Sequence, residues 1–201
     1  GPSIPLGSFG STDLSDDNSG YTNVGFNLQL INFGYKFSKH LGMAVMWSGS
    51  SFNIDKDAVL ANSGLETAFS VDATPYSFGS VLAGVLVSVP HGRFEFDFRG
   101  LIGLGYGISP EIKYNGFDLQ GEYAILKQDK SESFALAYDL GIGTRYNVSD
   151  LINLNLFVDY MGFKPEFSVD LYGNKTLIGT SKFDQPMNHL TITLGFGFRL
   201  N

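Results

Sequence analysis

The chain has 201 residues, a net charge of −7 and no cysteine. That length is enough for one domain with a buried core, and the lack of cysteine excludes disulfide frameworks and Cys-ligated metals. The negative charge argues against a nucleic-acid partner. Only 16% of the residues are charged, whereas there are 25 glycines, 18 phenylalanines and 10 tyrosines, a composition that favours a β-rich fold over disorder.

The sequence contains no apolar run of about eighteen residues and therefore predicts no transmembrane helix. A closed β-barrel would cross a membrane with a much weaker hydropathy signal. The opening stretch GPSIPLGSFG lacks the charged and apolar regions of a signal peptide, so we expect any such peptide to have been removed already. Gly1 and Pro2 resemble the scar of a protease site, and the predicted single domain is 3–201.

Eight segments are predicted to be β-strands, most of them because large apolar side chains recur at every second position. In chain order they are SIPLGSF (3–9), VGFNLQLINFGYKF (24–37), LGMAVMWSG (41–49), SFGSVLAGVLVSV (77–89), RFEFDFRGLIGLGYG (93–107), SFALAYDLGIGTRYN (133–147), LINLNLFVDYMGF (151–163) and HLTITLGFGFRLN (189–201). The last segment alternates most regularly, from Leu190 to Leu200. In the second segment the apolar positions change parity at Leu30 and Ile31, which predicts a β-bulge.

The connections between these segments alternate in length. Short turns are expected at 38–40, 90–92 and 148–150, and long loops at about 10–21, 53–75, 109–132 and 164–186. Within the second loop, DAVLANSGLETAF is expected to form one or two helical turns. Short turns at one end and long loops at the other are typical of outer-membrane barrels, whose loops are extracellular. The predicted fold class is all-β: an eight-stranded antiparallel transmembrane β-barrel, an up-and-down meander with both termini in the periplasm.

The composition of the polar stripe indicates which face of the barrel meets lipid. In a soluble barrel the polar stripe faces water and should be rich in Lys, Glu and Gln. Here it is mostly Gly, Ala, Thr, Ser and Asn, which fits a crowded interior, so we expect the apolar stripe to face lipid. The charged residues predicted to point inward, as a structural network, are Lys36, Glu95, Asp97, Arg99, Asp139, Arg145, Asp159 and Arg199. Four are basic and four acidic, so they can neutralise one another.

Strand direction divides this network into two groups. Those expected at the turn end, as a salt-bridged plug, are Lys36, Glu95, Asp97, Arg145 and Arg199. The other three lie further along the barrel. If Tyr146 pairs with Ile152, Asp139 falls opposite Asp159, so that two carboxylates meet on the inner face. Two interpretations remain open: a structural network bridged by Arg99 or water, and a shared proton or cation site.

Several phrases of the sequence resemble one family of membrane proteins. IPLGSFGSTDL, GFNLQLINFGYKF, AYDLGIGTRYNVSD and the terminal LTITLGFGFRL are similar to small outer-membrane β-barrels, in particular the OmpA/OmpX-like barrels of Bacteroidetes-type bacteria. The resemblance extends over nearly the whole chain. It implies a barrel in the outer membrane, in contact with its lipid and lipopolysaccharide. It does not imply one function, because such barrels serve as anchors, adhesins, small-solute pores and occasionally enzymes.

Two further motifs and one histidine could in principle carry chemistry. Asp13, Ser15 and Asp17 alternate as in a calcium loop, but the EF-hand glycine and glutamate positions do not match, so no metal site is predicted. GLIGLGYG has a GxGxG spacing without a following helix, so its glycines are expected to relieve crowding inside the barrel. His189 lies near the outer end of the last strand, where a lipid A-modifying barrel enzyme would place its chemistry.

The sequence thus predicts a non-enzymatic outer-membrane protein that acts as a structural, surface-interaction or accessory subunit through four long loops. No catalytic residue, cofactor or metal ligand is assigned. The alternatives are a narrow conduit for small or hydrophobic solutes, a lipid A-modifying enzyme and a soluble ligand-binding barrel. A protein or extracellular ligand bound by the loops is the expected partner besides the outer-membrane lipid and lipopolysaccharide.

Overall fold

A computed structural model of the chain describes residues 1–16, 18–64, 68–117 and 121–199. Within these residues the chain forms thirteen strands in two antiparallel sheets. The first sheet is a closed barrel that contains, in the order in which they pair, β1 (Pro2–Pro5), β13 (His189–Phe198), β10 (Ile152–Phe163), β9 (Glu132–Asn147), β6 (Phe94–Ile108), β5 (Tyr76–His91), β3 (Leu41–Phe52) and β2 (Gly25–Lys36). Barrel strands that follow one another in the chain are neighbours, which is a meander.

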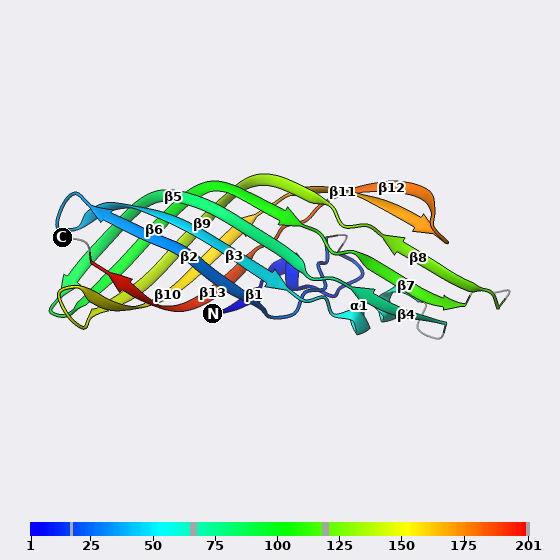
Figure 1. Ribbon diagram of the computed structural model, residues 1–201, viewed down its shortest axis with the longest axis horizontal. Coiled ribbons are helices and arrows are strands. Elements are labelled where there is room, and N and C mark those ends of the chain that lie inside the picture. The colour runs from blue at the N-terminus through cyan, green and yellow to red at the C-terminus, as the bar shows by residue number, and fades with distance from the viewer. Residues whose placement is uncertain (17, 65–67, 118–120, 200–201) are drawn as a thin grey trace.

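The second sheet extends the barrel at the end away from the short turns (Figure 1). In pairing order its strands are β12 (Thr176–Asp184), β11 (Glu166–Gly173), β8 (Tyr123–Gln128), β7 (Ile112–Phe117) and β4 (Phe69–Ala73). A 3-10 helix η1 (Gly7–Gly10) follows β1, and an α-helix α1 (Lys56–Ser63) precedes β4. Among the described residues, no helix combines the length and the apolar character needed to cross a bilayer.

The all-β class with antiparallel sheets is confirmed, but the predicted total of eight strands is wrong. Three of the regions expected to be loops contain five further strands, which lie beyond the barrel. In that second sheet β8 and β12 lack the apolar alternation of the barrel strands, and β4 and β11 alternate over only five and eight residues. The helical turns expected in DAVLANSGLETAF are present as α1, while residues 65–67 of that motif lie outside the described residues.

One local prediction, the end of the first strand, was wrong, and the predicted β-bulge was confirmed. The expected first strand ends at Pro5, and the chain turns into η1 instead of continuing to Phe9. Gly1 exchanges backbone hydrogen bonds with Asn27, and Pro2 pairs with Phe26, so both residues lie against β2. The predicted bulge is confirmed by a register shift between Gln29 and Ile31.

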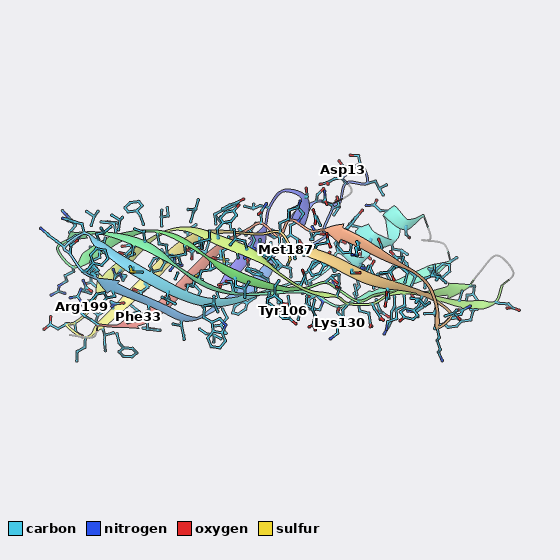
Figure 2. The ribbon with its side chains drawn as sticks, turned by 90° about the horizontal axis from the view of Figure 1, so that it is seen from above. Asp13, Phe33, Tyr106, Lys130, Met187 and Arg199 are labelled. Atoms are coloured by element: carbon cyan, nitrogen blue, oxygen red, sulfur yellow. The ribbon has the colours of Figure 1, made fainter. Side chains whose placement is uncertain are left out.

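The apolar stripe covers the outside of the barrel. On β6 and β9, Phe98 is 50% exposed and Leu140 60%, whereas their chain neighbours Asp97 and Asp139 are 1% and 0% exposed. The same alternation runs around the barrel, and Figure 2 shows the outward side chains, Phe33 among them. On β5, which corresponds to the fourth predicted strand, Val81 points outward and Leu82 inward.

The inside of the barrel changes character along its length. Towards the second sheet it is filled by an apolar cluster, whose largest fully buried members include Phe9, Phe52 and Phe167. Phe9 comes from η1 and packs edge-to-face against Phe52 and Tyr76, with ring centroids 4.9 and 5.4 Å away. Towards the short turns the interior is polar and charged. The N-terminal segment therefore closes the barrel from the side of the second sheet.

Candidate functional site

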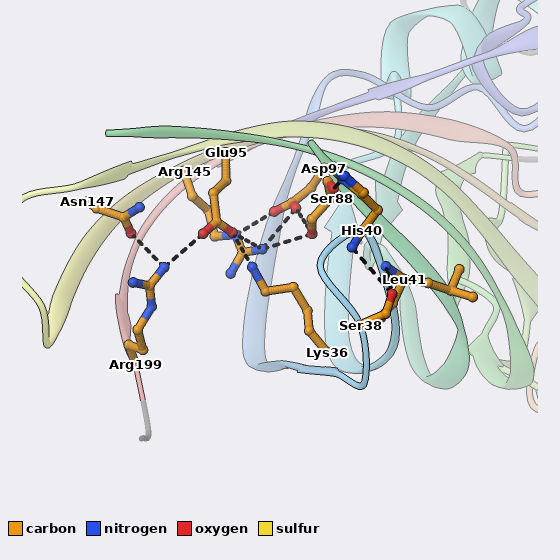
Figure 3. Close-up of polar contacts among 10 residues, drawn as sticks. All are labelled: Lys36, Ser38, His40, Leu41, Ser88, Glu95, Asp97, Arg145, Asn147 and Arg199. Atoms are coloured by element: carbon orange, nitrogen blue, oxygen red, sulfur yellow. Dashed lines mark hydrogen bonds and ion pairs between the residues drawn. The ribbon is translucent and has the colours of Figure 1, made fainter. Parts of the chain in front are cut away.

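A group of four ionised side chains fills the turn end of the barrel (Figure 3). Glu95 on β6 lies at its centre. Its Oε2 is 2.8 Å from Nζ of Lys36 and 3.0 Å from Nη2 of Arg145, and its Oε1 is 2.8 Å from Nη2 of Arg199. Glu95 and Arg145 are register partners across β6 and β9, so their side chains emerge on the same face. Lys36 on β2, Arg145 on β9 and Arg199, which directly follows β13, thus each bring a cation to one carboxylate.

Asp97 extends this cluster towards the middle of the barrel. Arg145 donates to both of its oxygens, from Nε at 2.5 Å and from Nη2 at 2.9 Å. Ser88 on β5 adds a hydroxyl that donates to Asp97 Oδ1 at 2.5 Å. The bidentate geometry fixes the guanidinium plane of Arg145, and the serine satisfies an oxygen that is otherwise remote from water.

A second cluster, one step deeper, is organised by Arg99. Its Nε is 3.3 Å from Asp139 Oδ1, and its Nη2 is 2.8 Å from Asp159 Oδ2, with all three side chains almost completely buried. Asn32 accepts from Nη1 at 2.9 Å, and Gln29 donates to Asp159 Oδ2 at 2.9 Å. One guanidinium therefore holds two carboxylates at the centre of the barrel.

The structure places all eight candidate residues of the interior network on the inner side of the barrel, and each has an ion-pair partner. The expected register of the β9–β10 hairpin is wrong: Tyr146 pairs with Leu154, and Asp159 lies opposite Gly141. Asp139 and Asp159 are consequently offset by two residues and meet through Arg99 instead of directly. Two side-chain amides of β2, Gln29 and Asn32, also point inward and were not predicted. The alternation on each side of the predicted bulge does assign both of them to the inner face.

Gly141 makes room for the central cluster. A Cβ atom at this position would lie 2.2 Å from Asp159 Oδ1 and 2.7 Å from Arg99 Nε. We expect Gly141→Ala to lower the free energy of unfolding by about 1–3 kcal/mol, because the ion pairs must shift in a packed interior. Urea titration of the two folded proteins measures this. Gly195→Ala is the matched control, since nothing lies within 4 Å of a Cβ there, and an equal loss in both variants would contradict the packing argument.

The other motifs of the sequence occupy structural positions. His189 is completely buried between the rings of Phe52 and Phe78, and its Nε2 is 3.4 Å from Ser50 Oγ. Gly105 and Gly107 lie under the ring of Phe163, as expected of glycines that relieve crowding. Gly103 instead adjoins the backbone of β5.

The calcium-like motif forms a local turn. Asp13 Oδ1 accepts from the backbone and hydroxyl of Ser15, both at 2.9 Å, and these hydrogen bonds hold the pKa of Asp13 below its usual range. Asp17 lies outside the described residues. In the part of the chain that the structure describes, no three His, Cys, Asp or Glu side chains are grouped to hold a metal ion.

A pocket of about 280 Å³ opens where the second sheet meets the barrel. Its lining comes from several segments, with tyrosines and side-chain amides prominent: Tyr21, Asn62, Tyr76, Tyr114, Gln128 and Gln185. Tyr21 has φ of 51°, a left-handed conformation that is unusual for a bulky residue and stores backbone strain. Asn62 donates to Tyr21 Oη at 3.2 Å and to Thr12 O at 2.8 Å, which ties α1 to the first loop.

The second sheet also carries a partly buried ionic cluster next to the pocket. Glu111 lies 2.7 Å from Lys113 Nζ and 2.9 Å from Lys127 Nζ. Hydrogen bonds from these two lysines hold the pKa of Glu111 below its usual range. Lys127 also pairs with Asp129, and its own pKa is raised by the two carboxylates. Glu111 and Lys127 therefore stay ionised across the neutral range.

Comparison with protein-family models and with curated proteins finds no match to this chain.

Proposed function

We propose that this protein is a non-enzymatic outer-membrane β-barrel that presents its second sheet and adjoining loops outside the membrane as an interaction surface. The observation that carries the proposal is the apolar band around the outside of the barrel. Exposed positions on different strands include Phe33, Trp47, Phe98, Leu140 and Leu194, which are 48–78% exposed. A soluble monomer rarely exposes an apolar patch of more than a few hundred Å².

The contents of the barrel support an anchor over a conduit. One end is crossed by the Glu95 ion-pair cluster, the middle by Arg99 with its two carboxylates, and the other end by the Phe9 cluster. Between the first two clusters there is a cavity of only about 50 Å³. A larger cavity of about 810 Å³ lies at the turn end, but the buried Arg99 cluster and the Phe9 cluster occupy the rest of the interior. An eight-stranded barrel packed in this way is not expected to leave a continuous passage for solutes.

The interaction role rests on what lies beyond the barrel. The second sheet has two edge strands, β4 and β12, and it adjoins the pocket lined by tyrosines and amides. Rigid sheets and short helices hold such a surface more precisely than free loops. Lipopolysaccharide, whose head groups lie at this level of an outer membrane, and an extracellular ligand or protein are the proposed partners.

A pair of arginine substitutions tests the membrane location. Leu140 lies near the middle of β9 and is 60% exposed, while Leu177 on β12 of the second sheet is 54% exposed. If the barrel is embedded, Leu140→Arg lowers the free energy of unfolding in phospholipid bilayers by about 2–4 kcal/mol, because its charge lies in hydrocarbon. Leu177→Arg stays within about 0.5 kcal/mol of the unsubstituted protein.

The measurement is urea unfolding of the protein in bilayers, in which the remaining folded form is detected by its gel mobility. Equal small effects of both substitutions, together with folding in buffer without detergent or lipid, would show a soluble barrel and overturn the proposal. Steady ion conductance in planar bilayers would favour the conduit instead.

A further inference from the structure

The pocket of about 280 Å³ between the second sheet and the barrel is built by segments that lie far apart in the sequence. Its walls come mainly from the first loop, α1, β7, β8 and β12. Figure 1 shows α1 beside β4 and β7, beyond the mouth of the barrel. We call this site the sheet pocket, and the polar side chains on its walls include Tyr21, Asn62, Tyr114 and Gln128.

One wall of the sheet pocket is a face of the second sheet. Ile112 and Tyr114 are alternate residues of β7, so their side chains emerge on the same side of the sheet. Gln128 on β8 is the register partner of Ile112 and therefore shares that side. The ring of Tyr114 also packs against the buried apolar cluster. Paired strands thus hold a phenol and an amide in fixed positions on the pocket wall.

Tyr21 contributes to another wall and is held in place by its backbone. Its N–H donates to Ser11 O at 3.0 Å, and its C=O accepts from Asp55 N–H at 2.7 Å. Together with the hydrogen bond from Asn62 to the Tyr21 hydroxyl, these bonds hold the left-handed conformation of Tyr21. Strained residues of this kind concentrate at ligand sites. Here the strained residue supplies a ring and a hydroxyl to the pocket wall.

The sheet pocket keeps hydrogen-bonding groups that the fold does not use. Within the described residues, neither the hydroxyl of Tyr114 nor the side-chain amide of Gln128 has a hydrogen-bond partner. The Tyr21 hydroxyl accepts from Asn62, and its own hydrogen has no acceptor in the same part of the chain. Burial and the nearby Tyr21 hydroxyl raise the pKa of Tyr114, so this phenol stays protonated at neutral pH. Groups that can both donate and accept therefore line one small pocket.

The lining also limits the charge and polarity of a ligand. No charged side chain is among the described residues that line the pocket. An ionised ligand would lose its water there without gaining a counter-ion, and a purely apolar ligand would leave the amides and hydroxyls without partners. The aromatic rings of Tyr21, Tyr114 and Phe183 carry partial negative charge on their faces, which attracts C–H groups. The lining therefore fits an uncharged ligand that has a C–H face and several hydroxyl groups.

We propose that the sheet pocket binds an uncharged sugar residue, whose C–H face packs on a tyrosine ring and whose hydroxyls bond to Tyr114 and Gln128. This inference rests on the proposed function, because it names the class of ligand for the surface presented outside the membrane. Each sugar hydroxyl both donates and accepts, as the phenols and amides of the wall require. The volume of about 280 Å³ lies just below the range of about 300–1,000 Å³ for small-molecule sites, so the pocket takes one or two sugar rings. The rest of a longer glycan extends into solvent.

Saturation-transfer NMR tests this inference, because irradiation of the aromatic protons of the protein marks ligand protons that lie against a ring. The full chain is studied in a phosphocholine detergent, which has no sugar head group. The probes are the neutral disaccharides maltose, lactose, cellobiose and di-N-acetylchitobiose, and the polysaccharide released from lipopolysaccharide by removal of lipid A. We expect saturable transfer to the ring C–H protons of at least one probe. Transfer to the polysaccharide alone would identify lipopolysaccharide as the source of the sugar, and transfer to a disaccharide alone would identify a free oligosaccharide.

Two substitutions assign the binding to the sheet pocket. Tyr114→Phe removes one hydroxyl and Gln128→Leu removes one amide, and each leaves a side chain of similar size. Each should raise the dissociation constant about fivefold, as expected for the loss of one hydrogen bond. Tyr123→Phe is the matched control, because Tyr123 lies on β8, is 58% exposed and does not line the pocket, so the dissociation constant should stay unchanged.

The contrary outcomes are equally specific. The inference would be overturned by the absence of transfer to every probe, or by unchanged dissociation constants in both pocket variants. Tighter binding of indole or of glucose 6-phosphate than of every neutral sugar would also overturn it, because the pocket would then select apolar or ionised ligands. Sugar binding by a protein that fails to enter bilayers would contradict only the proposed function, whereas a protein that enters bilayers and binds no sugar would contradict only this inference.

Discussion

Replacement of Arg99 by methionine is expected to lower the free energy of unfolding by about 3–5 kcal/mol, because it leaves two carboxylates buried without their cation. Asp139 and Asp159 are both 0% exposed, and Arg99 is the cation that each of them contacts. Asp139 depends on it most, since neither of its oxygens accepts a hydrogen bond within the described residues. Urea unfolding of the barrel in bilayers or detergent measures the loss.

The controls for this prediction separate burial from charge. Lys164→Met removes a cation from an exposed pair with Asp184, 2.8 Å long, and should change stability by less than about 1 kcal/mol. The triple variant Arg99→Met with Asp139→Asn and Asp159→Asn has no charge left in the central cluster and should regain most of the loss. If Arg99→Met were as stable as the original protein, the three side chains would not form a coupled network.

The barrel strands could be predicted from the sequence because the two faces of each strand lie in different environments. Alternation on β6 and β9 separates Phe98 from Asp97 and Leu140 from Asp139, and the structure buries each member as that pattern requires. The bulge on β2 was readable for the same reason, since one extra residue exchanges the two faces. Wherever one face is apolar and the other polar, parity alone assigns each side chain to a side.

The second sheet and the register of individual pairs were not predictable in this way. The strands β8 and β12 show no regular alternation, so their sequence resembles that of loops, while β4 and β11 alternate over only five and eight residues. The β9–β10 register depends on the geometry of the turn after Asn147, and an error of two residues leaves every side chain on its correct face. The sequence was therefore enough to predict which charged side chains point inward. It was not enough to predict which residue of the neighbouring strand lies opposite each carboxylate.

The burial of Phe9 could not be predicted from side-chain alternation, because Phe9 lies in η1 and not in a strand. Residues 3–9 were expected to form the first strand of the barrel, yet η1 turns inward and inserts this ring among side chains from β3 and β5. A single aromatic residue in an irregular segment carries no periodicity. Its burial depends on the path that the chain takes after Pro5. That path is fixed in part by a hydrogen bond of 2.9 Å from Leu6 N–H to Asn188 O.

Phe9→Ala is expected to lower the free energy of unfolding by about 3–5 kcal/mol, because truncation leaves a cavity in a packed cluster. The ring is completely buried, and its backbone oxygen also accepts the hydroxyl of Thr22 at 2.5 Å, so the first loop is tied to the same point. We therefore expect the loss of the ring to loosen the N-terminal segment as well, seen as faster proteolysis between η1 and β2. Urea unfolding and limited proteolysis measure the two effects.

Leu14→Ala provides the matched control, since it lies in the same N-terminal region and is 66% exposed. It should leave both the free energy of unfolding and the proteolysis rate nearly unchanged. If the two substitutions had the same small effect, Phe9 would not stabilise the barrel mouth, and closure would depend on Phe52, Phe78 and Phe163 alone. If Phe9→Ala destabilised the fold without faster cleavage, the hydrogen bonds of the first loop would suffice to hold the segment in place, because backbone pairing of β1 with β2 and β13 persists without the ring.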